Sequence, residues 1–138
     1  MPAHVTILYP FLAPEAITPS VEHDLESVLS PFRAFAFRLV GVDRFSGVLY
    51  LKPEPADPFR ALTSAVHDRW PDHPPYGGDF KTVIPHVTVV QGSEPPNVGA
   101  ELEAAAPIEA EATEVWLMVE SGQAWVLRKR FQLARDPV

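Results

Sequence analysis

The feature that most constrains the fold is an internal repeat, in which the same succession of elements occurs twice. Each copy opens with the triplet His-Val-Thr, at residues 4–6 and again at residues 86–88. A Pro-rich turn, a helical segment and a pair of strands joined at Ser-Gly follow each triplet. Self-similarity of this kind indicates a duplicated arrangement. The chain is therefore expected to consist of two related halves and not of one continuously wound sheet.

Local patterns predict the individual elements. Alternating apolar and polar residues predict strands at residues 4–11, 35–45, 47–52, 86–91, 109–120 and 123–133. Capping residues and early prolines predict helices at residues 18–29 and 57–70, and a weaker helix is expected at residues 98–106. Together these elements predict an α+β fold. It is expected to be a bilobal, pseudo-twofold duplicated arrangement of antiparallel sheets with outer helices and a cleft between the lobes.

The repeat also predicts how the chain is divided. The 138 residues are expected to form a single domain, with a first lobe at about residues 1–52 and a second at about residues 57–138. The second triplet is preceded by a strand and a helix that the first triplet lacks. Uncovered sheet edges and large apolar patches tend to be paired or covered. Either a twofold homodimer or a longer natural chain would supply the cover.

The net charge of the chain limits the classes of molecule that it can bind. Acidic residues number 18 against 11 Lys and Arg, which gives a formal net charge of −7. A protein that binds an extended nucleic-acid backbone needs a basic surface, because neutralising phosphates supplies most of the affinity. The one dense basic run, at residues 128–130, is expected to form solvated charges along a strand edge. Extended nucleic-acid binding is therefore disfavoured, whereas one phosphate in a pocket is compatible with this balance.

The chain contains no cysteine, which excludes disulfides, thiolate metal sites and cysteine nucleophiles. It has no run of 18 apolar residues that would indicate a membrane span. Its first residues also lack the basic and apolar regions of a secretory signal. We therefore expect a cytoplasmic protein without a membrane partner.

The two triplets combine residue types that suit phosphodiester chemistry. Within a strand, residues two apart share a face, so each histidine projects together with its threonine. If the strands meet about the pseudo-twofold axis, both pairs line one cleft. One imidazole can then accept a proton from the attacking hydroxyl or water while the other donates one to the leaving oxygen. The hydroxyls can donate hydrogen bonds to the non-bridging oxygens. This predicts a phosphoesterase that needs no metal and no cofactor, with the catalytic residues His4, Thr6, His86 and Thr88.

The stretches Ala-His-Val-Thr-Ile-Leu-Tyr-Pro-Phe from residue 3 and Ile-Pro-His-Val-Thr from residue 84 resemble the two signature motifs of the two-histidine phosphoesterase superfamily. The resemblance is greatest to its bacterial 2′-5′ RNA ligase-like branch. Members act on 2′,3′-cyclic phosphates, 2′-5′ linkages or other cyclic phosphodiesters. The resemblance therefore implies a cyclic phosphodiesterase or 2′-5′ RNA ligase-like enzyme. Its partner would be a small cyclic nucleotide or an RNA end that carries a cyclic phosphate.

Four further residues near the triplets are candidates for substrate binding. Tyr9 and Tyr76 are aromatic side chains on which a base can stack. Ligase members carry an arginine three residues after the second threonine, where this chain has Gln91. A charged clamp on the phosphate is thereby lost. Lys81 is the cation best suited to replace it.

Two alternatives stay open at this stage. Imidazole and carboxylate are common metal ligands, so His67, Asp72 and His73 are an alternative metal site, although their spacing fits no familiar motif. A non-catalytic module that binds a nucleotide or an RNA end would keep the same cleft without turnover. Turnover of a 2′,3′-cyclic nucleotide distinguishes the enzyme from this module. The sequence does not choose between hydrolase and ligase.

Overall fold

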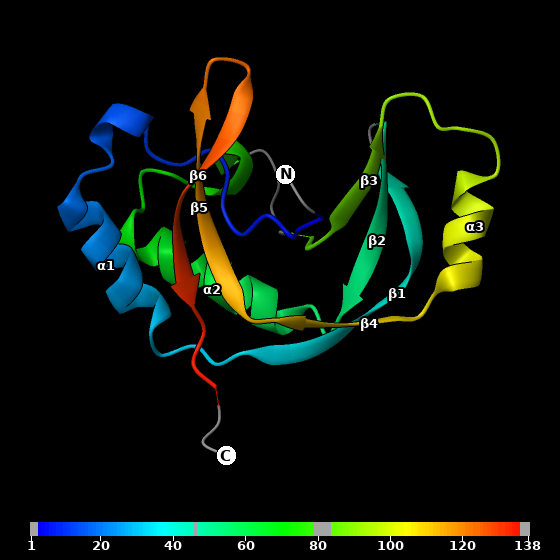
Figure 1. Ribbon diagram of the computed structural model, residues 1–138, viewed down its shortest axis with the longest axis horizontal. Helices are drawn as coiled ribbons and strands as arrows, with labels where there is room; N and C mark the ends of the chain where they lie inside the picture. Colours follow the sequence, from blue (N-terminus) through cyan, green and yellow to red (C-terminus); the bar gives the residue numbers. More distant parts are fainter. Residues whose placement is uncertain (1–2, 46, 79–83, 136–138) are drawn as a thin grey trace.

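The computed structural model describes residues 3–45, 47–78 and 84–135. Four strands form one antiparallel sheet in the order β3 (Val87–Gln91), β2 (Val48–Glu54), β1 (Phe35–Phe45) and β4 (Ile108–Ala112). A separate antiparallel pair consists of β5 (Glu114–Ser121) and β6 (Ala124–Gln132). The helical elements are η1 (Pro14–Ala16), α1 (Pro19–Leu29), α2 (Asp57–Arg69), η2 (Pro75–Gly78) and α3 (Val98–Ala105). Figure 1 shows α1 beside the β5–β6 hairpin and α3 at the opposite end of the molecule.

The main core lies between α1, α2 and the β5–β6 hairpin. Helix α1 begins after Thr18, whose side chain accepts a hydrogen bond from the amide of Val21 at 3.3 Å. Its apolar residues recur at helical spacing and face the hairpin. Among the described residues, no helix is both long and apolar enough to cross a membrane. The buried side chains of this core are Ile17, Leu25, Leu29, Leu62, Val66, Trp70, Leu117, Phe131 and Leu133.

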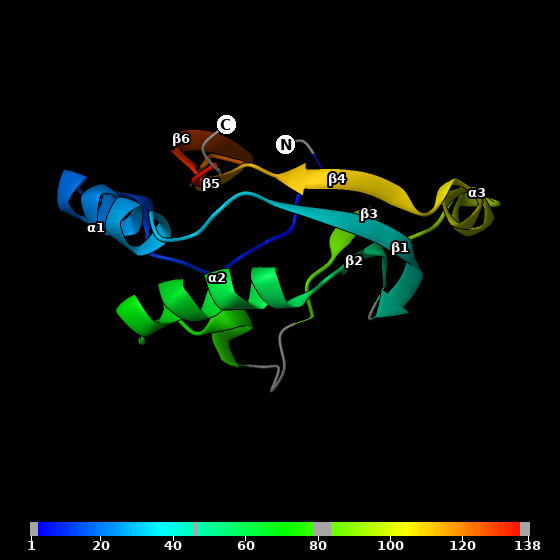
Figure 2. The same ribbon diagram turned by 90° about the horizontal axis from the view of Figure 1, so that it is seen from below.

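The four-stranded sheet packs on α2 through aromatic side chains. The ring of Phe59 on α2 meets those of Phe35 and Phe37 on β1, with centroids 5.0 Å apart in both pairs. Figure 2 shows α2 lying along one side of β1. Edge-to-face aromatic pairs of this kind stabilise a contact by about 0.5–1.5 kcal/mol beyond their buried area. Helix α2 therefore fixes the position of the sheet relative to the main core.

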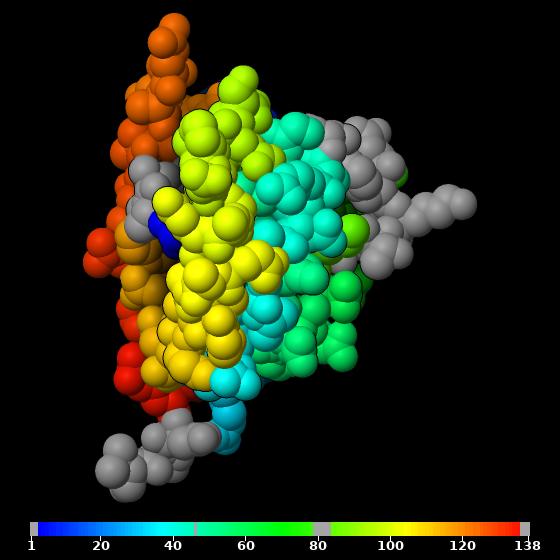
Figure 3. Space-filling view, turned by 90° about the vertical axis from the view of Figure 1, so that its right-hand side faces the viewer, coloured from blue at the N-terminus to red at the C-terminus, as the bar shows by residue number. Residues whose placement is uncertain are grey.

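Helix α3 covers the far end of the sheet (Figure 3). The carboxylate of Glu103 accepts a hydrogen bond from the amide of Val42 on β1 at 2.8 Å. Just before the helix, the carboxylate of Glu94 receives two hydrogen bonds from the guanidinium of Arg44, at 2.7 and 2.9 Å. Paired contacts of this type add geometric specificity as well as energy. They hold α3 against the C-terminal part of β1.

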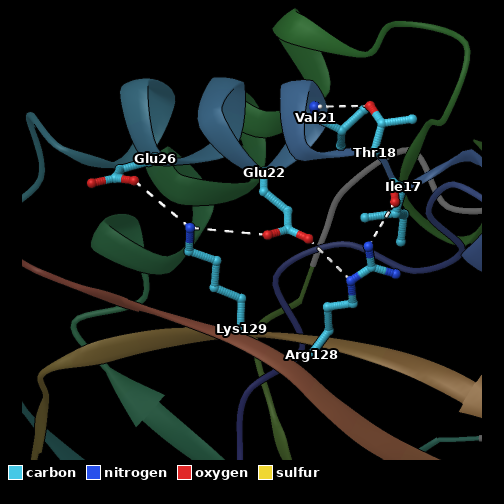
Figure 4. Close-up of polar contacts among 7 residues, drawn as sticks. All are labelled: Ile17, Thr18, Val21, Glu22, Glu26, Arg128 and Lys129. Atoms are coloured by element: carbon cyan, nitrogen blue, oxygen red, sulfur yellow. Dashed lines mark hydrogen bonds and ion pairs between the residues drawn. The ribbon is translucent and has the colours of Figure 1, made fainter.

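The basic run at residues 128–130 lies in β6 beside a β-bulge. The register of the hairpin shifts between Leu117 and Met118, which leaves Arg128 as an additional residue on β6. An additional residue interrupts the strict alternation of a strand. Arg128 and Lys129 can therefore both turn toward α1, as Figure 4 shows.

Both side chains contact carboxylates of α1. Arg128 donates to Glu22 at 3.0 Å and to the backbone oxygen of Ile17 at 2.8 Å. The ammonium of Lys129 lies 4.0 Å from Glu22 and 3.9 Å from Glu26. Arg128 is exposed and Lys129 half-buried, so both stay at the surface as expected, but the bulge directs them toward an acidic helix where each is paired.

The long strand expected at residues 109–120 is two strands. Residues up to Ala112 pair with β1, whereas Glu114 begins the pairing with β6. The chain thus passes from one sheet to the other at Thr113. The prediction of one continuous strand fails because alternation along a segment does not tell which partner the segment pairs with.

The N-terminal segment (residues 3–13) is not the regular strand predicted at residues 4–11. Val5 forms an isolated bridge, and the neighbouring backbone carbonyls bond elsewhere. The oxygen of Ile7 accepts a hydrogen bond from the Thr63 hydroxyl at 2.6 Å, and the oxygen of Tyr9 accepts one from the Tyr76 amide at 2.5 Å. These two carbonyls face α2 and the η2 turn, so they cannot continue a strand ladder.

The bilobal duplication is not confirmed by the strand pairing. Strands β1 and β2 were expected in the first lobe, yet they share a sheet with β3 and β4 of the expected second lobe. The pairing therefore crosses the expected boundary near residues 52–57. What the described residues form is a mixed α and β fold with a curled antiparallel sheet, a second short sheet and helices outside them.

Candidate active site

The two His-Val-Thr triplets, here called the first motif (residues 4–6) and the second motif (residues 86–88), lie side by side. Their central residues, Val5 and Val87, form an antiparallel bridge. In an antiparallel register centred on this pair, each histidine is opposite the threonine of the other motif. Since successive side chains alternate between faces, both histidines and both threonines belong to the face opposite the valines.

This register sets the spacing of the two motifs. Directly opposite residues have Cβ atoms about 4.5–5.5 Å apart, and diagonal neighbours are about 7–8 Å apart. His4 and His86 are diagonal neighbours in this register.

A cavity of about 1040 Å³, here called the cleft, adjoins the first motif. His4, Thr6 and Thr88 are among its lining residues, together with Tyr9 and Gln91. Its described lining does not include His86. The cleft therefore contains three of the four expected catalytic residues, and His86 lies beside it on β3's N-terminal side.

The described walls of the cleft are mostly apolar, and their carboxylate side chains make the charged part of the lining acidic. They include three glutamates, Glu111, Glu114 and Glu120, but no Lys or Arg. Hydrogen bonds from the Trp116 indole and then from the Gln132 amide hold the pKa of Glu114 below its ordinary value. These walls offer hydrogen-bond donors, and no permanently charged cation, to an anionic ligand.

The ring of His86 is fixed by neighbours on β1 and β2. It lies edge-on to Phe45 and Tyr50, with centroids 5.1 and 5.5 Å away. Its Nδ1 is 2.8 Å from the backbone oxygen of Ile84. A carbonyl only accepts hydrogen bonds, so Nδ1 carries the proton and Nε2 is the nitrogen left for proton exchange.

Tyr50 links the second motif to the hairpin of β1 and β2. It pairs directly with Thr88, and its side chain is only 5% exposed. Burial raises the pKa of Tyr50, and the nearby Asp43 carboxylate, which accepts a hydrogen bond from it, raises the pKa further. Sequence reasoning missed Phe45 and Tyr50 beside His86, and Asp43 beside Tyr50, because these contacts depend on how β2 pairs with β1 and β3.

The other substrate-binding candidates have different settings. Tyr9 is 45% exposed, and its ring lies 5.9 Å from that of Trp125, another exposed residue that lines the cleft. Tyr76 lies in η2 with a positive φ of 52°, is not among the described cleft residues, and has its pKa raised by burial. Lys81 lies outside the described residues. Trp125 was not predicted from sequence, although an aromatic residue beside the Ser-Gly turn was a usable signal.

No group of three or more His, Asp or Glu side chains that could hold a metal ion occurs within residues 3–45, 47–78 and 84–135. His67, Asp72 and His73 all belong to these ranges, so the alternative metal site does not form. His73 instead lies edge-on to Phe11, with ring centroids 6.1 Å apart. Its ring is half-buried beside the N-terminal segment.

A comparison with protein families matches residues 1–124 to the 2′-5′ RNA ligase superfamily. No individual curated protein matches the chain. The family match spans both motifs, the four-stranded sheet and β5, and it ends at the first residue of β6. The chain belongs to the 2′-5′ RNA ligase superfamily, and through it to the two-histidine phosphoesterases.

Proposed function

We propose that the chain cleaves or forms a cyclic phosphodiester or a 2′-5′ phosphodiester without a metal ion. The observation that carries this proposal is the bridge between Val5 and Val87, which brings the two motifs together in antiparallel register. Such a register gives two imidazoles and two hydroxyls on one face. Membership of the 2′-5′ RNA ligase superfamily supports the same class of chemistry.

In this proposal the two histidines exchange protons with the reacting oxygens. Nε2 of one accepts a proton from the attacking water or ribose hydroxyl, and the other imidazole donates a proton to the leaving oxygen. Thr6 and Thr88 donate hydrogen bonds to the non-bridging oxygens, where charge develops in the transition state. One histidine must be neutral while the other is protonated, so the rate depends on pH with a bell-shaped profile.

The proposed substrates are small. A cyclic mononucleotide or the cyclic phosphate at an RNA end presents one phosphodiester to the motifs. The acidic walls and the formal net charge of −7 disfavour a long nucleic acid, whose many phosphates would need many cations. Tyr9 and Trp125 offer exposed rings for a base.

The test is a screen of 2′,3′-cyclic nucleotides, 2′-5′ dinucleotides and RNA with cyclic-phosphate ends, each with and without a chelator. We expect turnover that falls by roughly 10²–10⁴-fold in His4→Ala and in His86→Ala. His23→Ala, an exposed histidine of α1, is the matched control and should keep full activity. Binding without turnover would point to a nucleotide-binding module. Turnover that the chelator abolishes would point to a metal enzyme.

A further inference from the structure

Lys52 lies next to the second motif in the register of β2 and β3. Tyr50 is opposite Thr88, and Leu51 is opposite Val87. Continuing this antiparallel register by one residue brings Lys52 opposite His86. Lys52 therefore flanks His86 on β2, while the first motif flanks it on the other side.

The alternation of side chains supports the same placement. Leu51 is buried, with 5% of its side chain exposed, so it points to the core side of the sheet. Lys52 is exposed and belongs to the opposite face, which it shares with Tyr50. The ring of Tyr50 contacts that of His86 at 5.5 Å, which shows that His86 also projects from this face.

Within the part of the chain that the structure describes, Lys52 has no carboxylate partner. Among the described residues, none of the ion pairs or hydrogen bonds involves its ammonium. Other cations of the chain are engaged: Lys129 with two carboxylates of α1, and Arg44 with Glu94. Lys52 is thus an exposed residue beside the second motif, and its ammonium is available to bind an anion.

We propose that Lys52 binds a non-bridging oxygen of the phosphodiester and supplies the charge that Gln91 does not. This inference rests on the proposed function of the two motifs. A lysine ammonium is a compact charge with three donors on a flexible stem, so it can reach across the diagonal between the two histidines. One such cation matches a ligand with one phosphodiester charge.

The test compares Lys52→Met and Lys52→Arg with Arg135→Gln, which removes an exposed cation elsewhere. With a 2′,3′-cyclic nucleotide, Lys52→Met should raise KM by roughly 10- to 100-fold, in line with the loss of one charge-assisted hydrogen bond, and change kcat less. Lys52→Arg should restore most of this loss, and Arg135→Gln should behave like the natural protein. Thermal unfolding should show that all three variants fold.

A second measurement follows the binding of inorganic phosphate by its effect on the unfolding temperature. Lys52→Met should lose the stabilisation by phosphate, whereas Arg135→Gln keeps it. If Lys52→Met turns over substrate with unchanged KM and keeps its response to phosphate, the role of Lys52 is overturned and the proposed function stands. If the natural protein turns over none of the substrates, the proposed function fails, and the phosphate response alone decides whether Lys52 binds phosphate.

Discussion

The two motifs have the same three residues but different surroundings. His4 is exposed, and its motif contains one isolated antiparallel bridge, at Val5, and is not part of a regular strand. His86 is half-buried between Phe45 and Tyr50, its Nδ1 is bonded to a carbonyl, and a regular strand begins directly after it. The second motif is therefore part of a sheet, and the first is attached to it.

The two motifs are therefore expected to be alike in the reaction but unequal in what they contribute to the stability of the fold. The register gives each histidine the same relation to the threonine of the other motif, so both should contribute similarly to a reaction. Burial gives them unequal shares in the fold, because His86 is half-buried whereas His4 is exposed. Substitutions at matched positions of the two motifs test both expectations.

The largest expected effect tests the chemical equivalence. Thr6→Val and Thr88→Val each remove one hydrogen-bond donor, and each should lower kcat by roughly 10²–10³-fold. Steady-state kinetics on a 2′,3′-cyclic nucleotide measures both, with Ser27→Ala, an exposed hydroxyl of α1, as control. A large loss in one variant with full activity in the other would show that the two motifs are not equivalent.

The next effect concerns how the first motif is held. The Thr63 hydroxyl donates to the backbone oxygen of Ile7 at 2.6 Å from a buried position on α2. Thr63→Val keeps the shape and leaves that oxygen without its partner, which should lower the free energy of unfolding by about 1–3 kcal/mol. Urea denaturation measures this, and Ser64→Ala on the exposed side of α2 is the control. Equal stability of both variants would contradict the anchoring role.

A smaller effect tests the unequal packing of the histidines. His86→Ala removes ring contacts and a hydrogen bond, and should lower the free energy of unfolding by about 1–2 kcal/mol. His4→Ala should stay within about 0.5 kcal/mol of the natural protein, as surface substitutions usually do. The same urea experiment compares them. An equal loss of unfolding free energy in both variants would contradict this difference in packing.

The smallest effect is a pH dependence. Burial raises the pKa of Tyr50 above its ordinary value of about 10, so the folded state holds this proton more tightly than the unfolded state does. That stability is fully present below the ordinary pKa and is lost as pH rises through the raised one. Tyr50→Phe should therefore lose less stability than the natural protein between neutral and strongly alkaline pH. Denaturation at several pH values checks this, and parallel curves would rule it out.

The elements with local signals were predictable from sequence. Thr18 caps α1 and a proline follows it, whereas α2 begins at Asp57 and Pro58 without a side-chain cap, so only its early proline acts as the local signal. Gly47 and Gly122 mark the hairpin turns and have φ values of 78° and 65°, which glycine adopts without strain. The two motifs were found in the same way, as short repeated strings.

Which strands pair with which could be learned only from the structure. Alternation of residues does not say which sheet a strand joins, so the change of sheet at Thr113 was missed. For the same reason the packing of Tyr50 on His86, and the position of Lys52, followed only from the register of β2 and β3. These residues are more than 30 positions apart in the chain, and no local pattern connects them.

The isolated bridge between Val5 and Val87 has a consequence for slow motions of the folded protein. A contact held by so few backbone bonds opens at a lower free energy than the sheet beside it, without unfolding of the whole chain. A ligand that touches both motifs binds only the closed arrangement and therefore stabilises it. Hydrogen exchange at the bridge amides would then slow on ligand binding, while exchange in β1 and β2 stays the same. Hydrogen exchange at the bridge between the two motifs would therefore show whether a ligand is bound, without a measurement of turnover.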